Sequence, residues 1–395
     1  MIQLADKELC TGCGACAFKC PHSCIMMKED GMGQMVPIID VDVCVECHVC
    51  QRICPVLNSP SVQEPKKAYA AWSLDEEQRT TSASGGIAYE LYKYALEQGC
   101  LVVGASFNDD FSVSLKIGKT LNEIIPFKNS KYVFSTCYEV YPEIEECLKR
   151  GVQMLVMGVP CQIAAMRKLY ARYKNILYVE ILCHGMTPYS YLRQHVDVVE
   201  ADKGKKAFSM SFRAPEFDTA TYTLCLYDVA GGRFYSARTI DGDTYQYGFH
   251  RGITYRESCY HCSFAQPKRS GDIVLCDFYG LGAKHPFTQD KHNVSCVVVN
   301  TEVGMSFFQS AVATGRLCVE ERPLEEAVEG NPRLQHPNYK NKDRLAFEKS
   351  IIEAKGDFEK AIAPLAAHYL REVNRPIWWH RCKNVFYRVI SFLNK

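Results

Sequence analysis

The chain lacks three features that would each define a broad class of protein. It has no run of about 18 consecutive apolar residues, so the sequence predicts no membrane-spanning helix. It has almost no net charge, because 46 Lys and Arg residues oppose 45 Asp and Glu residues, and this balance argues against a nucleic-acid protein that neutralises phosphates. Residues 1–7 carry no basic stretch leading into an apolar core, so they do not resemble a signal peptide. We therefore expect a cytoplasmic protein.

Cysteine, by contrast, is abundant: the chain has 21, and eight of those in the first 54 residues form two copies of one spacing. Each copy reads C-x2-C-x2-C-x3-C-P, and the positions are Cys10, Cys13, Cys16 and Cys20, then Cys44, Cys47, Cys50 and Cys54. In two-cluster bacterial ferredoxins the first three cysteines of each run hold one 4Fe-4S cluster and the fourth holds the other. The spacing predicts one cluster on Cys10, Cys13, Cys16 and Cys54, and a second on Cys44, Cys47, Cys50 and Cys20.

Zinc and disulfides are the alternatives, and both fit the pattern less well. Structural zinc sites use two C-x2-C pairs per metal and have no need of a third cysteine at the next step. Disulfide frameworks are typical of short exported chains with an even cysteine count, whereas this chain is long and its count is odd. Cys24 lies outside the pattern, and we expect it to be a small buried residue with no ligand role. Residues 1–58 thus resemble a dicluster ferredoxin, which passes single electrons.

The remaining residues are numerous enough for further domains. Residues 59–67 are polar and contain two prolines, so we interpret them as a linker. Between residues 68 and 335, β-rich runs alternate with helical ones, which predicts a larger α/β domain after the α+β ferredoxin-like domain. The expected strands are 100–107, 152–158, 176–182, 273–277 and 295–300, the expected helices are 87–97 and 162–173, and a hairpin is expected to join 221–228 to 233–238.

Residues 336–395 are predicted to form a helical C-terminal region with a breaker at Pro376. Beyond the breaker, apolar residues recur at helical spacing, with basic residues largely on the other side. The apolar positions are Trp378, Cys382, Val385, Phe386, Val389 and Leu393. A basic amphipathic helix of this kind can make peripheral contact with an anionic membrane. Such a stripe more often packs on its own domain or on a partner, and we favour that interpretation.

Two short motifs could contact a phosphate and a ring. Ser84, Gly85 and Gly86 lead into the expected helix at residue 87, where free N–H groups and the helix dipole favour an anion. The same motif is commonly only a cap and a turn. Lys131 could neutralise a phosphate and Tyr132 could stack on a ring, although both could equally lie in a surface loop.

Four cysteines outside the ferredoxin pattern form another candidate group. Cys161 and Cys183 each follow an expected strand, and neighbouring parallel strands would deliver their side chains to one crevice. With Cys259 and Cys262, which form a C-x2-C pair, they could hold a third 4Fe-4S cluster. The alternative is that Cys161 and Cys183 are small buried residues.

In this order the motifs resemble the family of coenzyme F-420 hydrogenase/dehydrogenase beta subunits, from about residue 68 to residue 282. The resemblance is carried by Ser84-Gly85-Gly86, Ser130-Lys131-Tyr132, Gly158-Val159-Pro160-Cys161-Gln162, Cys183-His184-Gly185, Ser211-Phe212-Arg213, and Ser258-Cys259-Tyr260-His261-Cys262 with Asp272 and Asp277 downstream. It implies an α/β domain that binds FAD and one 4Fe-4S cluster. The implied FAD contacts are Ser84, Gly85, Gly86, Lys131 and Tyr132, and the implied cluster ligands are Cys161, Cys183, Cys259 and Cys262.

One stretch departs from the family's pattern. Where the family usually has Gly-Asp-aromatic-Trp-Gly, this chain reads Cys276-Asp277-Phe278-Tyr279-Gly280. Cys276 could line the cluster pocket or replace one of the implied ligands. The missing tryptophan leaves the substrate open, including whether the deazaflavin coenzyme is used.

These features predict an iron–sulfur flavoprotein oxidoreductase that moves electrons between its clusters and FAD to reduce or oxidise an organic substrate or a deazaflavin coenzyme. His184 and Asp277 are candidate catalytic residues, or polar residues that hold a loop. We expect a redox partner protein or a ferredoxin as partner, and a homo-oligomer is compatible with the sequence. Two alternatives are an electron-transfer subunit without its own metabolite substrate and a non-enzymatic redox sensor.

Overall fold

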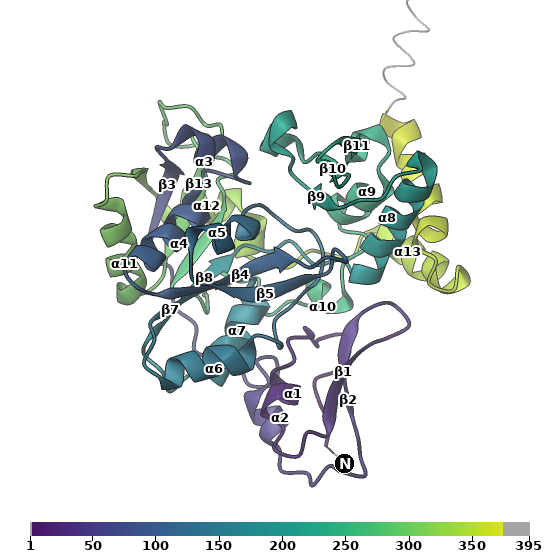
Figure 1. Ribbon diagram of the computed structural model, residues 1–395, viewed down its shortest axis with the longest axis horizontal. Coiled ribbons are helices and arrows are strands. Elements are labelled where there is room, and N and C mark those ends of the chain that lie inside the picture. Colours follow the sequence, from purple (N-terminus) through teal and green to yellow (C-terminus); the bar gives the residue numbers. More distant parts are fainter. Residues whose placement is uncertain (1, 374–395) are drawn as a thin grey trace, which may run out of the picture.

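The computed structural model describes residues 2–373 and is shown in Figure 1. Its N-terminal module contains an antiparallel hairpin of β1 (Ile25–Glu29) and β2 (Met35–Ile39), and two short helices, α1 (Ala15–Lys19) and α2 (Val49–Ile53). Each helix follows a residue of positive φ, and the two helices lie at the same offset from their cysteine runs. The repeat in the sequence is therefore also a repeat in the structure.

The larger part of the chain is built on a nine-stranded sheet of order β14-β3-β13-β12-β8-β7-β4-β5-β6. In chain order its strands are β3 (Lys67–Ser73), β4 (Leu101–Phe107), β5 (Val113–Gly118), β6 (Ser135–Thr136), β7 (Met154–Gly158), β8 (Ile176–Ile181), β12 (Ile273–Asp277), β13 (Ser295–Val299) and β14 (Leu317–Arg322). Strands β4, β7, β8 and β12 run parallel, whereas β13, β3 and β14 continue the sheet antiparallel. The expected α/β sheet is thus mixed, because no helix returns the chain between β12 and β13.

Helices cover both faces of this sheet. Helices α4 (Ile87–Glu97) and α11 (Glu302–Val312) pack on one face, and α6 (Tyr141–Lys149) and α7 (Pro160–Leu169) pack on the other. Strand β7 is buried along its whole length, as expected for a central strand covered on both sides. Helix α7 lies between the sheet and the N-terminal module (Figure 1). The other helices in this part are α3 (Glu76–Thr81), α5 (Leu121–Ile124), α10 (Glu257–Tyr260) and α12 (Leu324–Gly330).

A second lobe lies beside the large sheet (Figure 1). It contains a three-stranded antiparallel sheet of order β11-β10-β9 and several helices. The strands are β9 (Ser209–Ser211), β10 (Leu224–Tyr227) and β11 (Arg233–Ala237), and the helices are α8 (Tyr189–Lys203), α9 (Thr244–His250) and α13 (Lys342–Glu353). Residues 358–373 are also helical. Aromatic side chains dominate the core of this lobe, including Phe212, Tyr245 and Phe358.

Most of the expected elements are confirmed. Strand β12 and helix α4 have the predicted bounds, and β10 and β11 form the predicted hairpin. The helix predicted to begin at residue 162 begins at Pro160 instead, because proline is well tolerated in the first turn, and it ends at Leu169. The predicted breaker at Pro376 and the apolar stripe beyond it lie outside the described residues. Within residues 2–373, no helix is long and apolar enough to cross a membrane.

Candidate redox site

The eight cysteines of the ferredoxin pattern surround two cavities in the N-terminal module. One cavity is lined by Cys10, Cys13, Cys16 and Cys54, and the other by Cys20, Cys44, Cys47 and Cys50. The fourth cysteine of each run therefore crosses to the other group, which is the arrangement that the spacing predicted. Cys24 is buried, as expected, but it also lines the second cavity, and its Sγ lies 3.3 Å from the Sγ of Cys20.

The first group of cysteines faces the large domain. The carbonyl oxygen of Cys13 accepts hydrogen bonds from the hydroxyl of Tyr141 at 2.9 Å and from the thiol of Cys137 at 3.4 Å. Gly14, which has a φ of +70°, lies against Tyr138 so closely that an added Cβ would fall 2.6 Å from the Cβ of Tyr138. At the other end of the module, Cys47 of the second group is exposed. The two groups thus run from the surface of the module to its contact with the large domain.

A third cavity is lined by the four cysteines outside the ferredoxin pattern, Cys161, Cys183, Cys259 and Cys262. Cys161 lies in the first turn of α7 and Cys183 follows β8, so neighbouring parallel strands deliver both thiols to one place. Cys259 lies on α10, and Cys262 follows that helix. Burial, with a smaller contribution from Cys262, raises the pKa of Cys259 to about 11, so these thiols are neutral unless a metal ionises them.

Unpartnered donors show what this cavity is suited to hold. The side chains of Thr11, Arg256, Arg269 and Arg333 line it, and each has a buried nitrogen or oxygen without a hydrogen-bond partner. Arg269 is paired with Glu180 at 2.7 Å, but one of its nitrogens, like those of Arg256 and Arg333, still lacks an acceptor. Because a buried donor without an acceptor is costly, these guanidinium nitrogens suit an anionic group in the cavity. Four thiolates with a four-iron cluster form a net anion whose sulfurs accept hydrogen bonds. The residues present therefore fit a 4Fe-4S cluster.

A much larger cavity, of about 600 Å³, lies at the carboxyl ends of β7, β8 and β12. This volume is in the range of cofactor and ligand sites. Ser84, Gly86, Lys131 and Tyr132 line it, as do the buried and unpartnered Ser82 Oγ and Asn129 Oδ1. Polar groups without partners around an open cavity fit a ligand with many hydrogen-bonding atoms, such as a dinucleotide. The residues present thus fit FAD.

Lys131 and Tyr132 are both held in place at the wall of this cavity. The ammonium of Lys131 donates to the carbonyl oxygens of Lys128 at 2.9 Å and Asn129 at 3.2 Å. Burial lowers the pKa of Lys131 to about 7. The ring of Tyr132 stacks on Phe249 with 4.4 Å between centroids, so one of its faces is already covered.

Gly85 lies behind the cavity, which differs from its expected contact with FAD. Its N–H donates to Ser295 Oγ at 2.9 Å, and an added Cβ would fall 2.6 Å from the carbonyl oxygen of Ala71. Gly85 is thus needed for close packing against β3 and β13. Gly86 has a φ of +80° at the N-cap of α4 and does line the cavity.

The third cavity and the large cavity share a wall. Cys183, His184, Gly185 and Met186 line both of them. Gly185 has a φ of +147°, and an added Cβ would fall 2.3 Å from the ring of Tyr255, so only glycine fits there. A group in one cavity therefore lies next to a group in the other.

Several polar residues line the far part of the large cavity. Asp277 is paired with Arg213 at 3.2 Å and accepts a hydrogen bond from the hydroxyl of Tyr279 at 3.3 Å. Burial lowers the pKa of His184, and it lowers the pKa of His250 to about 4, so both imidazoles are neutral at neutral pH. Sequence reasoning named His184 and Asp277 but missed His250 and gave Arg213 no role. The position of Arg213 in the Ser-Phe-Arg motif was the available signal for it.

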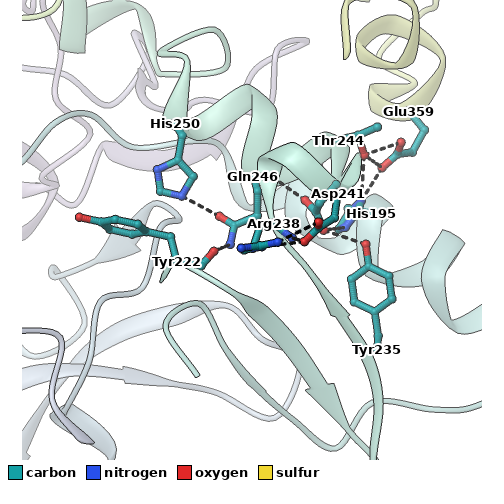
Figure 2. Close-up of polar contacts among 10 residues, drawn as sticks. His195, Tyr222, Tyr235, Arg238, Asp241, Thr244, Gln246, His250 and Glu359 are labelled. Atoms are coloured by element: carbon teal, nitrogen blue, oxygen red, sulfur yellow. Dashed lines mark hydrogen bonds and ion pairs between the residues drawn. The ribbon is translucent and has the colours of Figure 1, made fainter. Parts of the chain in front are cut away.

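A buried polar network begins at His250, which lines the large cavity, and leads into the second lobe (Figure 2). His250 Nε2 lies 3.0 Å from Gln246 Oε1, and the backbone N–H of Gln246 donates to Asp243 at 2.6 Å. Asp243 in turn lies 3.1 Å from His195, whose other ring nitrogen lies 2.6 Å from Glu359. The network therefore connects the cavity wall to the helix formed by residues 358–373.

Comparisons with known proteins agree with this architecture. The profile of the 4Fe-4S dicluster domain matches residues 9–58. The profiles of the coenzyme F420 hydrogenase/dehydrogenase beta subunit match residues 68–141 for its N-terminal part and residues 152–325 for its C-terminal part. The fold and these matches define an iron–sulfur protein of the oxidoreductase class, with a ferredoxin-type domain that carries 4Fe-4S clusters. The chain belongs to the family of coenzyme F420 hydrogenase/dehydrogenase beta subunits.

Individual relatives are distant. A component of the F(420)H(2) dehydrogenase of Methanosarcina mazei is 22% identical over 194 residues, which are 46% of this chain and 55% of that protein. The coenzyme F420-dependent sulfite reductase of Methanocaldococcus jannaschii is 27% identical over 175 residues, which are 42% of this chain and 26% of that protein. The matches thus span about half of the first protein and about a quarter of the second. A solved structure of the F420-reducing [NiFe] hydrogenase complex from Methanosarcina barkeri aligns over 76% of this chain and 91% of its own, with 20% identity and a TM-score of 0.46.

Proposed function

We propose that this chain is an iron–sulfur flavoprotein that moves electrons between an exposed ferredoxin cluster and an organic substrate. The proposed path has four stations: the second cysteine group, the first group, a third 4Fe-4S cluster on Cys161, Cys183, Cys259 and Cys262, and FAD in the large cavity. The unpartnered polar atoms of the third cavity suit a cluster, and those of the large cavity suit FAD.

The observation that carries this proposal is that the third cavity shares residues both with the cavity of the first cysteine group and with the large cavity. Thr11, which lies between the ligands Cys10 and Cys13 of the first group, also lines the third cavity. The segment from Cys183 to Met186 lines both the third cavity and the large one. Sites that share lining residues are adjacent, as an electron relay requires, whereas a purely structural use of the clusters would not need them to be adjacent.

When bound, FAD would supply the exchange between single electrons and a hydride or an electron pair. The residues of this chain bind and orient the ligands. Lys131 would neutralise a phosphate, and Ser82, Ser84 and Asn129 would form hydrogen bonds to polar atoms of the dinucleotide. His184 and His250 are neutral, so each can both donate a proton and accept one through its ring nitrogens.

The substrate is proposed to enter the polar part of the large cavity, near His184, His250 and Asp277. Asp277 is held by Arg213 and Tyr279, so it can anchor a bound molecule without moving. The names of the relatives, which refer to coenzyme F420, support a deazaflavin as the substrate.

A second candidate function is electron transfer to or from a partner protein, without a metabolite substrate. The exposed Cys47 favours a protein partner, because the neighbouring Val41, Val43 and Val45 are also exposed, at 56%, 47% and 59%. An apolar surface beside a cluster is suited to docking another redox protein. A chain that passes electrons from reduced deazaflavin to a dye but reduces no metabolite would favour this function.

The first test is the cofactor content of anaerobically purified protein. We expect about twelve irons and one FAD per chain, and the Cys161→Ser variant should lose about four irons while keeping the other eight. The matched control is Cys318→Ser, since Cys318 lines none of the four cavities and should leave the iron content unchanged. Purified and reconstituted protein that holds only eight irons and no flavin would refute the proposal.

A further inference from the structure

Two neighbouring cysteines, of which one lines the large cavity, belong to none of the three groups of cluster thiols. Cys276 is the residue before the last in β12, and the antiparallel register of β12 and β13 sets it directly opposite Cys296. Cys276 lines the large cavity, whereas Cys296 is fully buried in the core on the same face of the sheet. The structure thus answers the question raised by Cys276: it lies beside the proposed flavin site and does not line the third cavity.

The backbone geometry of this pair suits a reversible disulfide. The N–H of Phe278 donates to the carbonyl oxygen of Val294 at 3.3 Å, and hydrogen-bonded pairs recur at every second residue of an antiparallel ladder. Cys276 and Cys296 therefore also form a hydrogen-bonded pair, with Cα atoms about 5.5 Å apart, which is within the range of disulfides. Their Cβ atoms, about 5 Å apart, must approach by roughly 1 Å to close the bond, so the disulfide would be strained.

A strained disulfide is readily reduced, which suits a redox couple better than a permanent cross-link. The neighbouring thiol of Cys296, together with burial, raises the pKa of Cys276 well above its ordinary value, so reduced Cys276 keeps its proton. Cys276 is reachable from the cavity, and Cys296 lies where its thiol can close a disulfide with Cys276.

We propose that Cys276 and Cys296 form a redox-active dithiol that exchanges an electron pair with the flavin of the large cavity. Oxidation breaks two S–H bonds and forms one S–S bond, and it releases two electrons and two protons, which are what an oxidised flavin takes up. This inference rests on the proposed function for its electron acceptor. The pair gives the chain a store for two electrons beside the cavity, whereas each cluster passes one electron at a time.

The first experiment measures the thiol state of the anaerobic holoprotein directly. The protein is equilibrated with mixtures of reduced and oxidised dithiothreitol, quenched by alkylation under denaturing conditions, and digested for mass spectrometry, while visible absorbance reports that the clusters stay intact. We expect a peptide linked through Cys276 and Cys296 in oxidising mixtures and two alkylated thiols in reducing ones, with Cys318 alkylated in both. Two free thiols in every mixture, or a link from Cys276 to another cysteine, would overturn the proposal.

The second experiment counts electrons. Oxidised wild-type protein is titrated with a titanium(III) reductant and compared with Cys296→Ser and with Cys318→Ser at equal iron and flavin content. The Cys296→Ser variant should take up two electrons fewer per chain than the wild type, and the Cys318→Ser variant should match the wild type. Equal uptake by all three would refute the dithiol, and Cys276→Ala serves as a second variant if Cys296→Ser does not fold.

The outcomes separate this proposal from the one on which it rests. Protein that binds FAD but never forms the cross-link removes the dithiol and leaves the flavoprotein intact. Protein that forms the cross-link but binds no FAD keeps the dithiol and removes its proposed acceptor.

Discussion

Arg256 donates a hydrogen bond from Nη2 to the carbonyl oxygen of Met35 at 2.9 Å, although 221 residues separate them in the chain. The same nitrogen lies 3.4 Å from the carbonyl oxygen of Cys10. Arg256 is only 2% exposed, and its Nε and Nη1 have no hydrogen-bond partner while the side chain lines the third cavity. One guanidinium thus lies between the first group of cysteines and the third.

Replacing Arg256 with glutamine should lower the reduction potentials of the clusters on the first and third cysteine groups. The potential of the cluster on the second group should stay unchanged. The positive charge favours the reduced, more negative cluster, so its removal disfavours the added electron. Redox titration followed by electron paramagnetic resonance measures this shift, and Arg256→Lys should restore most of it. Arg172→Gln, which removes a charge from a largely exposed side chain, is the control. An equal shift of all clusters in Arg256→Gln would contradict this placement.

Replacing Gly14 with alanine should loosen the N-terminal module from the large domain. Its φ of +70° and the 2.6 Å approach to Tyr138 leave no room for a Cβ, so the change should cost about 1–3 kcal/mol. Proteolysis of the 59–67 segment in native protein measures the loosening and should become several-fold faster. Gly31→Ala in the same module is the matched control, since an added Cβ there meets no atom within 4 Å. Equal proteolysis rates for both variants would show that Gly14 does not fix the module.

The binding of FAD should weaken as the pH rises above about 7. Burial lowers the pKa of Lys131 to about 7, and a phosphate binds best when the ammonium is charged. Above this pH the free protein must take up a proton in order to bind, so the affinity should fall by up to about tenfold per pH unit. Flavin fluorescence quenching between pH 6 and 9 measures this dependence. Lys131→Arg keeps its charge and should bind with little dependence on pH, whereas a flat profile for the wild type would exclude this role for Lys131.

The stability of the second lobe should depend on the ionisation of His195 (Figure 2). Burial alone would lower the pKa of His195, but Asp243 and Glu359 outweigh it and raise the pKa to about 10. Because this value lies above that of the unfolded chain, the stabilisation is fully present below pH 6.5 and is lost as the pH rises through about 10.

The His195→Gln variant tests this dependence. Removing one partner of a buried ionic group should cost about 3–5 kcal/mol near pH 7, and the cost should shrink toward pH 10. Urea unfolding followed by circular dichroism at pH 7 and pH 9.5 measures both effects. His368→Gln is the control, because His368 is 59% exposed. A cost that does not change with pH would mean that His195 is neutral in the folded protein.

The cysteine groups could be predicted from sequence because their information is local. The C-x2-C steps define the two groups of the N-terminal module, and Cys161 and Cys183 each follow a run that forms a buried parallel strand. What converges from distant segments could not be predicted. Arg269 reaches the third cavity from a loop and Arg333 from the 3-10 helix Pro332–Leu334, and no local pattern marks either of them.

Two differences arise from pairing and packing. Cys276 faces Cys296 only because β13 runs antiparallel to β12, and alternation of strands and helices along the sequence favoured parallel pairing. Gly85 follows Ser84 in a motif typical of phosphate sites, yet its missing Cβ makes room for the backbone of Ala71. A glycine next to a cavity can be required by the strand behind it rather than by the ligand.

The four-residue wall from Cys183 to Met186 has a consequence for how such a chain can diversify. One side of this wall is tied to the cysteine-lined cavity and cannot change without disturbing it, whereas residues such as Tyr222 and Tyr279 line the large cavity from other segments. Selection for a new reactant can therefore alter those segments and leave unchanged the segment through which electrons enter the large cavity. Family members would then share the same route for electrons while differing in the substrate that they bind.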